Sequence, residues 1–261
     1  MACLKMIIKK LYRLKLLLII ITASLLTSCG SGSYSWGWFA VSPATAVGQR
    51  NIAFLIKGLI PTLTISLISI GISVSLGLIL ALFGLSKLKV LNHVHRVWVE
   101  LFRSVPVLVM LLWVYYGLPI STGLDLGVMT AAIISLALTD SAFEAEIFRA
   151  GIKSIPKSQH EAAKIMGCTE PQVLRYVILP QTIRNILPPL VNQFAYMLKI
   201  SSIASVIGLG ELTRKANELT VIEYRPLEIY TILILEYLVL VLVVSFFARK
   251  IERKLDMGRE E

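Results

Sequence analysis

Stretches that nearly exclude charged side chains recur along the chain and dominate its pattern. A helix needs about 20 apolar residues to cross a bilayer core of roughly 30 Å. Residues 58–85 and 104–124 reach that length without a charged side chain. Residues 126–145, 185–210 and 229–248 reach it with one or two ionisable groups each. The pattern predicts an all-α polytopic membrane protein with five core spans.

Composition and charge support this interpretation. The 261 residues are 56% hydrophobic and only 16% charged, and the net charge is +10. A basic chain can indicate nucleic-acid binding, but here the distribution of the charge indicates a membrane topology. Of the 26 Lys and Arg residues, 20 fall in segments 1–15, 86–103, 146–184 and 249–261.

These four basic segments alternate with the spans as the positive-inside rule requires if all four are cytoplasmic. We therefore expect a lipid bilayer around the spans and no nucleic-acid partner. The C-terminus, including a tail at 255–261, is expected in the cytoplasm.

The N-terminal residues 1–29 resemble a secretory signal, because basic residues precede the apolar run Leu16–Leu26. The following Thr27-Ser28-Cys29 completes a lipobox-like sequence, which makes Cys29 a candidate lipidation site. A signal anchor that is retained as an extra span explains the same residues, and we favour it. In either case the Gly/Ser/Trp-rich segment 30–51 is expected to be an external linker.

The segment 146–184 between the third and fourth core spans carries explicit helix signals. Ser158 and Glu161 have the spacing of a capping box and predict a helix that starts after Pro156. Gly167 predicts the left-handed stop of that helix.

A second helix is predicted directly after this stop. Thr169 and Gln172 form another box, with Pro171 in the first turn. The helix is expected to run to Leu179 and to end at Pro180.

The first helix presents small and apolar groups, among them Ala162 and Ala163, next to the polar Glu161. Such a surface suits insertion into a partner's cleft. The alternative is a solvated loop in which Glu161 only caps its own helix.

The order Glu161-Ala162-Ala163, Gly167 and Ile178-Leu179-Pro180 resembles the EAA loop of ATP-binding-cassette importer permeases. Residues 145–152 and 154–157 extend the likeness to the polar amino-acid subfamily. The resemblance runs from about Gly58 to Lys254 and implies a five-helix importer-permease core, placed at 52–254, plus the N-terminal signal-anchor or signal-peptide helix.

This resemblance implies that the segment 146–184 is a coupling loop docked on an ATPase, with its contacts at Ser158, Glu161, Ala162, Ala163 and Gly167. The chain has no phosphate-binding loop of its own, so we expect no cofactor here and ATP with Mg²⁺ on a separate ATPase dimer. The other implied partners are a second, identical or homologous permease subunit and an extracytoplasmic solute-binding protein. The implied location is the bacterial cytoplasmic membrane.

Ionisable groups inside spans are costly and therefore mark candidate functional sites. Asp140, Glu144, Lys199 and Glu236 are the four within the predicted core spans. Glu144 lies near the cytoplasmic end of its helix, where it can reach the membrane surface, and Glu236 can pair with a neighbouring subunit.

Lys199 belongs to Leu198-Lys199-Ile200-Ser201-Ser202, which is similar to a Leu-Lys-Asp-Thr-Ser pattern of the amino-acid permeases. Ile200 replaces the acid of that pattern, and Asp140 is expected to supply the negative charge instead. The alternative is that this subunit binds no solute and that its permease partner does so. The candidate substrate path consists of Thr139, Asp140, Lys199, Ser201 and Ser202.

Two other classes of function are considered. A secondary transporter or channel would use Asp140 and Lys199 as a charge relay, but such proteins usually show internal repeats. A lipid-anchored scaffold would depend on Cys29 alone. An enzyme or metal site is not expected, since His93, His95 and His160 form no nucleophile or ligand pattern.

Overall fold

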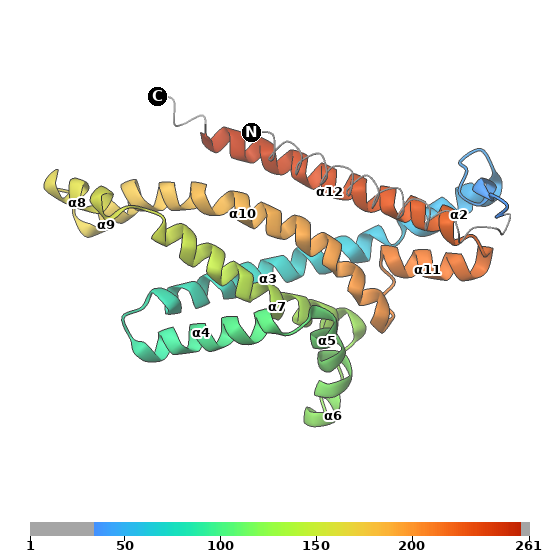
Figure 1. The fold of residues 1–261 in the computed structure, drawn as a ribbon, viewed down its shortest axis with the longest axis horizontal. Coiled ribbons are helices and arrows are strands. Elements are labelled where there is room, and N and C mark those ends of the chain that lie inside the picture. The colour runs from blue at the N-terminus through green and yellow to red at the C-terminus, as the bar shows by residue number, and fades with distance from the viewer. Residues whose placement is uncertain (1–33, 257–261) are drawn as a thin grey trace, which may run out of the picture. The chain divides into compact units, whose positions relative to one another are not determined.

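The computed structural model describes residues 34–256, and every regular element in this range is a helix. The apolar run Leu16–Leu26, Cys29 and residues 257–261 lie outside the described residues. The chain divides into two units, Met1–Gly37 and Trp38–Glu261, and the second contains the helices of Figure 1. In chain order these are η1 (Trp38–Ala40), α2 (Ala46–Ile56), α3 (Leu59–Leu85), α4 (Lys89–Ser104), α5 (Val107–Leu112), η2 (Trp113–Gly117), α6 (Leu118–Thr122), α7 (Val128–Lys153), α8 (Lys157–Ile165), α9 (Glu170–Gln172), η3 (Val173–Ile178), α10 (Leu179–Ile200), η4 (Ser201–Ile207), α11 (Leu212–Glu223) and α12 (Pro226–Asp256).

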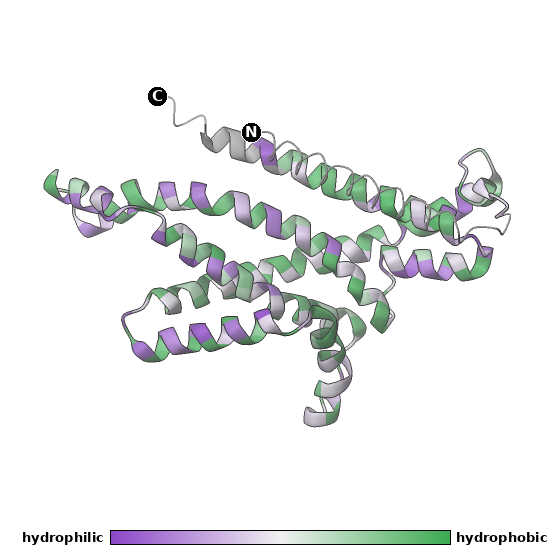
Figure 2. Ribbon diagram, viewed as in Figure 1, coloured by the Kyte–Doolittle hydropathy of each residue, from purple (hydrophilic) through white to green (hydrophobic). Residues whose placement is uncertain are grey.

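By length and composition, four helical stretches of the described chain can cross a membrane: Ala46–Leu85, Val128–Lys153, Glu170–Ile207 and Pro226–Phe247. A fifth span results if α4 and the stretch Val107–Thr122, which meet at 99°, are counted together. Hydrophobic residues dominate α12, whereas α11 is largely hydrophilic (Figure 2). Helices therefore occupy all five predicted ranges.

The expected linker 30–51 is wrong in its last part, because α2 already begins at Ala46. Thr45 caps this helix by accepting a hydrogen bond from the backbone N–H of Gly48, 3.0 Å away. Asn51 is buried and donates to the carbonyl oxygen of Ala40 at 2.9 Å. The Gly/Ser-rich composition of segment 30–51 suggested a linker, so Thr45 was not recognised as a helix cap.

The predicted helix end at Pro180 is also wrong, because the chain continues from η3 into α10 without a break. The π-helical η3 accommodates Pro180 within a continuous helix. In it, the N–H of Leu179 bonds to the carbonyl of Leu174, five residues earlier. Such a wide turn departs from the α-helical pairing just before the proline, which has no N–H to donate. The same arrangement precedes Pro119, where the N–H of Leu118 bonds to Trp113 in η2.

The helices α3 and α7 form the most extensive pair of the described chain. The face of α3 toward this contact carries small buried residues: Ser69, whose hydroxyl lies 3.4 Å from the carbonyl oxygen of Ile133, Ser73, which bonds to Asp140, and Gly77, which packs against Glu144. Small side chains let two helix backbones approach closely, which maximises dispersion contacts inside a membrane where the hydrophobic effect gives little. These small residues pack together with the buried apolar Ile65 and Leu80 of the same helix.

A buried hydrophobic core surrounds one end of this helix pair. It joins α3, α5, η2, α7, α10 and η4 through Ile65, Leu111, Val114, Ala131, Ala132, Leu136, Met197, Ala204, Ile207 and Leu209. By contrast, α12 keeps most of its apolar surface outside the described chain's interior. The lipid, or another subunit, is left to cover that surface.

The loop between η4 and α11 is attached to the start of α3. The backbone N–H of Leu212 donates to the Thr62 hydroxyl at 3.2 Å. Glu211 caps α11 by accepting from the N–H groups of Thr213 and Arg214, at 2.9 and 2.7 Å, and its carboxylate also accepts from the Tyr237 hydroxyl at 3.0 Å. Burial raises the pKa of the Glu211 carboxyl, and these hydrogen bonds act in the opposite direction. The segment thus ties α3, α11 and α12 together.

Replacing Gly77 by Ala tests the close approach of α3 and α7. A Cβ at this position would lie 2.5 Å from the Cβ of Glu144, so the helices must separate, at a cost of about 1–3 kcal/mol in the free energy of unfolding. Gly71→Ala is the matched control on the same helix, because a Cβ there meets no atom within 4 Å. We expect thermal unfolding of the detergent-purified chain to show a lower Tm for Gly77→Ala only. Equal Tm values for the two variants would contradict this packing.

Candidate functional site

The first helix of the predicted coupling loop is α8, which begins after Pro156 as expected. Its start differs from the prediction, because Pro156 is the N-cap residue and no side chain caps the helix. Ser158 lies inside the first turn, so the predicted box of Ser158 and Glu161 is wrong. Glu161 is exposed and is not used as a cap.

The end of α8 is the left-handed turn predicted at Gly167, which has a φ of 85°. The backbone N–H of Cys168 bonds to the carbonyl of Ala163, and the N–H of Gly167 bonds to that of Lys164. These two bonds define a Schellman motif. The motif fixes the direction in which the chain leaves α8.

The second predicted box is present. Thr169 and Gln172 cap each other reciprocally at the start of α9, and the Thr169 N–H donates to the Gln172 side chain at 2.8 Å. Glu170 links the two helices, because its carboxylate lies 2.8 Å from Lys164 Nζ and 2.9 Å from His160 Nε2. Two neighbouring short helices are thus held at a set angle by local contacts.

The outer surface of this pair is available for a partner. Glu161 and Ala162 are exposed, and Ile165 and Met166 at the tip are 87% and 76% exposed. Only Ala163 of α8 is buried. Two large apolar side chains at the tip of a polar helix are typical of a surface that docks on another protein.

The inner side of α8 is attached to α10. The Gln181 side chain of α10 donates to Gln159 of α8 at 3.3 Å, and the Asn185 side chain donates to the hydroxyl of Ser154, the C-cap residue of α7, at 2.8 Å. A cavity of about 600 Å³ lies beside these contacts. A displacement of α8 would therefore act directly on α10.

The candidate substrate residue Asp140 lies at the junction of three helices. On α7, its buried carboxylate accepts a hydrogen bond from the Ser73 hydroxyl of α3 at 2.7 Å and another from the Gln193 amide of α10. The sequence analysis placed Asp140 in the path but missed Ser73 and Gln193. Only the polar character of these two residues within apolar helices marks them in the sequence.

Glu144, one helical turn after Asp140, differs from the expectation. It is fully buried, and neither carboxylate oxygen has a hydrogen-bond partner within the described chain. It packs against Gly77 and so cannot extend to the membrane surface.

The remaining path residues do not join Asp140. Lys199 is exposed and forms no ion pair with any described residue. The hydroxyls of Thr139 and Ser201 donate to their own helix backbone, at the carbonyls of Ser135 and Leu198. Ser202 is half-buried. The predicted path thus separates into an acidic cluster at Asp140 and a separate basic residue.

Glu236 lies on α12 at the wall of an apolar cavity of about 460 Å³. One of its carboxylate oxygens is buried without a partner in the described chain. Its pairing with a neighbouring subunit stays a prediction.

Comparison with known proteins identifies relatives of the chain. Residues 73–257 match the family described as binding-protein-dependent transport system inner membrane component. The arginine transport system permease protein ArtQ of Bacillus subtilis is 37% identical over 205 residues, which are 78% of this chain and 94% of ArtQ. The glutamine transport system permease protein GlnP of Escherichia coli K12 is 35% identical over 221 residues, which are 84% of this chain and 98% of GlnP.

Solved structures share the fold. A crystal structure of an amino acid ABC transporter with histidines matches with a TM-score of 0.76 and 38% identity, covering 85% of this chain and 100% of its counterpart. An inward-facing structure of the MetNI methionine ABC transporter shares the fold with a TM-score of 0.67 at 22% identity, over 79% of this chain and 98% of its counterpart. Because the family match spans most of the chain and the relatives align over nearly their full length, the chain belongs to the family of binding-protein-dependent transport system inner membrane components.

Proposed function

We propose that this chain is the permease subunit of an ATP-binding-cassette importer for a polar amino acid or a similar small solute. Family membership supports the permease role, and the names of ArtQ and GlnP, which refer to arginine and glutamine transport, support the solute class. The observation that carries the proposal is the tip of α8, where the large apolar side chains of Ile165 and Met166 are exposed. The chain is not itself an enzyme, and a separate ATPase subunit hydrolyses ATP.

The family implies an ATPase and a solute-binding protein as partners, in the inner membrane. We extend this to an ATPase dimer that holds ATP and Mg²⁺, a second permease subunit and a cytoplasmic C-terminus. The exposed apolar face of α12 supports a second subunit, because a polar solute needs a pathway enclosed on all sides.

The coupling step follows from the contacts of α8. Ile165 and Met166 would enter a groove on the ATPase, and the Schellman turn at Gly167 together with Glu170 would keep α8 rigid. The hydrogen bond of Gln181 to Gln159 would then transmit a displacement of α8 to α10, and the bond of Asn185 to Ser154 joins α10 to the end of α7 that precedes α8. Such rigid-body movement is a standard means of alternating access.

Movement of α10 would change the surroundings of Asp140. Gln193 of α10 bonds to Asp140 in the structure, so separation of α10 from α7 would remove a donor from the carboxylate. The ammonium group of an amino acid can replace that donor with a charge-assisted hydrogen bond. We therefore assign Asp140 to solute binding.

A charge relay of Asp140 and Lys199 in a secondary transporter or channel is not supported. Asp140 is satisfied by Ser73 and Gln193, and Lys199 is exposed without an ion pair in the described chain. The relatives are permease subunits of binding-protein-dependent systems.

Substitution of Gly167 tests the coupling assignment. Gly167→Ala introduces a left-handed residue at a cost of roughly 1–2 kcal/mol, without a clash because no atom lies within 4 Å of the added Cβ. We expect the amount of solute transported per ATP hydrolysed to fall in vesicles that contain the whole transporter. Gly167→Asn is the control, since Asn tolerates this conformation better, and it should retain most coupling. Wild-type coupling in Gly167→Ala would show that the geometry of this turn does not matter.

Substitution of Asp140 tests the solute site. Asp140→Asn keeps the shape of the side chain and an acceptor for Ser73 but removes the charge. We expect uptake of a zwitterionic or cationic amino acid to fall by tenfold or more, as for loss of a charge-assisted hydrogen bond of about 1.5–3 kcal/mol. Ser75→Ala, on the exposed side of α3, should leave uptake unchanged. Unchanged uptake by Asp140→Asn would remove this residue from the site.

A further inference from the structure

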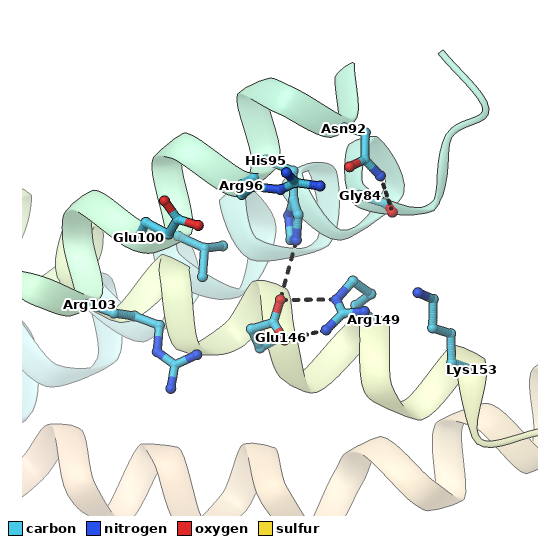
Figure 3. A pocket seen from close by; sticks show the side chains of 10 residues that line it. Gly84, Asn92, His95, Arg96, Glu100, Arg103, Glu146, Arg149 and Lys153 are labelled. Carbon is cyan, nitrogen blue, oxygen red and sulfur yellow. Dashed lines mark hydrogen bonds and ion pairs between the residues drawn. The ribbon is translucent and has the colours of Figure 1, made fainter. Parts of the chain in front are cut away.

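A polar cavity of about 500 Å³ opens between the end of α3, the helix α4 and the last turns of α7 (Figure 3). It lies at the same end of α7 as the coupling helix α8, because α8 follows α7 directly. Charged side chains line most of it: Arg96, Glu100, Arg103, Glu146, Arg149 and Lys153. Neither the helix α8 with its turn at Gly167 nor the cluster at Asp140 uses these residues.

The charges of this cavity are not balanced internally. Glu146 is engaged by Arg149 through two hydrogen bonds of 3.0 and 2.6 Å, and His95 Nε2 lies 3.3 Å from the same carboxylate. Arg103 and Lys153 lie on either side of this group in Figure 3, and neither forms an ion pair with a described residue.

Arg96 also forms no ion pair within the described chain, and Glu100 is the second carboxylate of the lining. The lining therefore has three cations without an ion pair, Arg96, Arg103 and Lys153, and one such acid, Glu100. A cavity with this balance attracts an anion.

A second cavity of about 290 Å³ adjoins the first and shares Asn92 and Arg96 with it. Its lining adds Lys87, Lys89 and His93 and contains no acid. The Asn92 amide donates to the Gly84 carbonyl at 3.0 Å, which holds the α3–α4 turn in place. The amino-terminal end of the 16-residue α4 lies here without a side-chain cap, and its dipole adds to the positive potential.

An apolar stripe runs along α4 beside these basic groups. Val90, Val94, Val97 and Leu101 recur at helical spacing and are 75%, 42%, 48% and 53% exposed. Basic and apolar surfaces therefore meet along one helix. A free phosphate ion would use only the first surface, whereas a phospholipid uses both.

We propose that the two cavities bind the phosphate headgroup of an anionic phospholipid, with its acyl chains against the stripe of Val90, Val94, Val97 and Leu101. Arg96 is the central headgroup ligand because it lines both cavities, with Arg103 and Lys153 on one side and Lys87 and Lys89 on the other. Basic pockets between membrane helices on the cytoplasmic side are suited to such lipids. The proposal rests on the orientation given under the proposed function, in which α8 is cytoplasmic, but not on the solute.

Native mass spectrometry of the purified full chain tests this inference. The chain is equilibrated with equal amounts of phosphatidylglycerol and phosphatidylcholine, and the retained lipids are counted. We expect preferential retention of phosphatidylglycerol, reduced roughly tenfold or more in the double variant Arg96→Gln/Lys153→Gln, as for loss of two cations at a lipid surface. The double variant Lys157→Gln/Arg175→Gln removes two exposed cations at the same membrane side but outside the cavities, and it should behave as the wild type.

Two further arms make the result decisive. Arg96→Lys/Lys153→Arg preserves the charges and should retain the lipid, which separates loss of charge from a folding defect. Inorganic phosphate is added as a competitor, and displacement of phosphatidylglycerol by millimolar phosphate would reduce the site to a general anion site and overturn the proposal. Equal retention of both lipids by the wild-type chain, or full retention by the Gln variant, would also overturn it. Because the chain is tested without ATPase or solute, failure here is distinguishable from failure of the proposed transport function.

Discussion

The close approach of α3 and α7 is the constraint on which the rest of the structure depends. Two helices that meet through small residues approach closely, and inside a membrane their contact is held by dispersion and by polar groups rather than by the hydrophobic effect. The polar groups inside that contact give it specificity. Ser73 and Asp140 bond across it, and Glu144 packs against Gly77.

The helix α10 connects the contact between α3 and α7 with α8, the helix proposed to dock on the ATPase. The Gln193 side chain of α10 donates to Asp140. Nearer the start of α10, Gln181 donates to Gln159 of α8 and Asn185 donates to Ser154 at the end of α7. The π-helical η3 makes this continuity physically reasonable, since it accommodates Pro180 without a break in the helix. A hinge at Pro180 would have decoupled α8 from Asp140, and the structure has none there.

Charge at the end of the bundle that bears α8 has more than one role. The positive-inside rule explains why Lys and Arg gather there, but not why they surround cavities beside an apolar stripe. A bound anionic lipid would neutralise Arg96, Arg103 and Lys153, which otherwise repel one another, and would support α4 against α3 and α7. The same Lys and Arg residues would then both set the orientation of the chain in the membrane and bind the lipid.

The sequence by itself determined the ranges of the five long apolar helical stretches, the left-handed turn at Gly167 and the cap formed by Thr169 and Gln172. These features depend on hydrophobic length and on hydrogen bonds between residues a few positions apart, so a local pattern is enough. Where the local signal was ambiguous, the prediction failed, as at Ser158 and Pro180.

Only the tertiary structure decided which polar residues meet. Asp140 finds partners 67 and 53 residues away, while Lys199, chosen from its sequence context, remains outside the cluster. The burial of Glu144 and the grouping of Arg96 with Lys153 likewise depend on how α3, α4, α7 and α10 pack. That packing is governed by shape complementarity between small side chains, which leaves hardly any trace in the hydrophobic pattern of each helix.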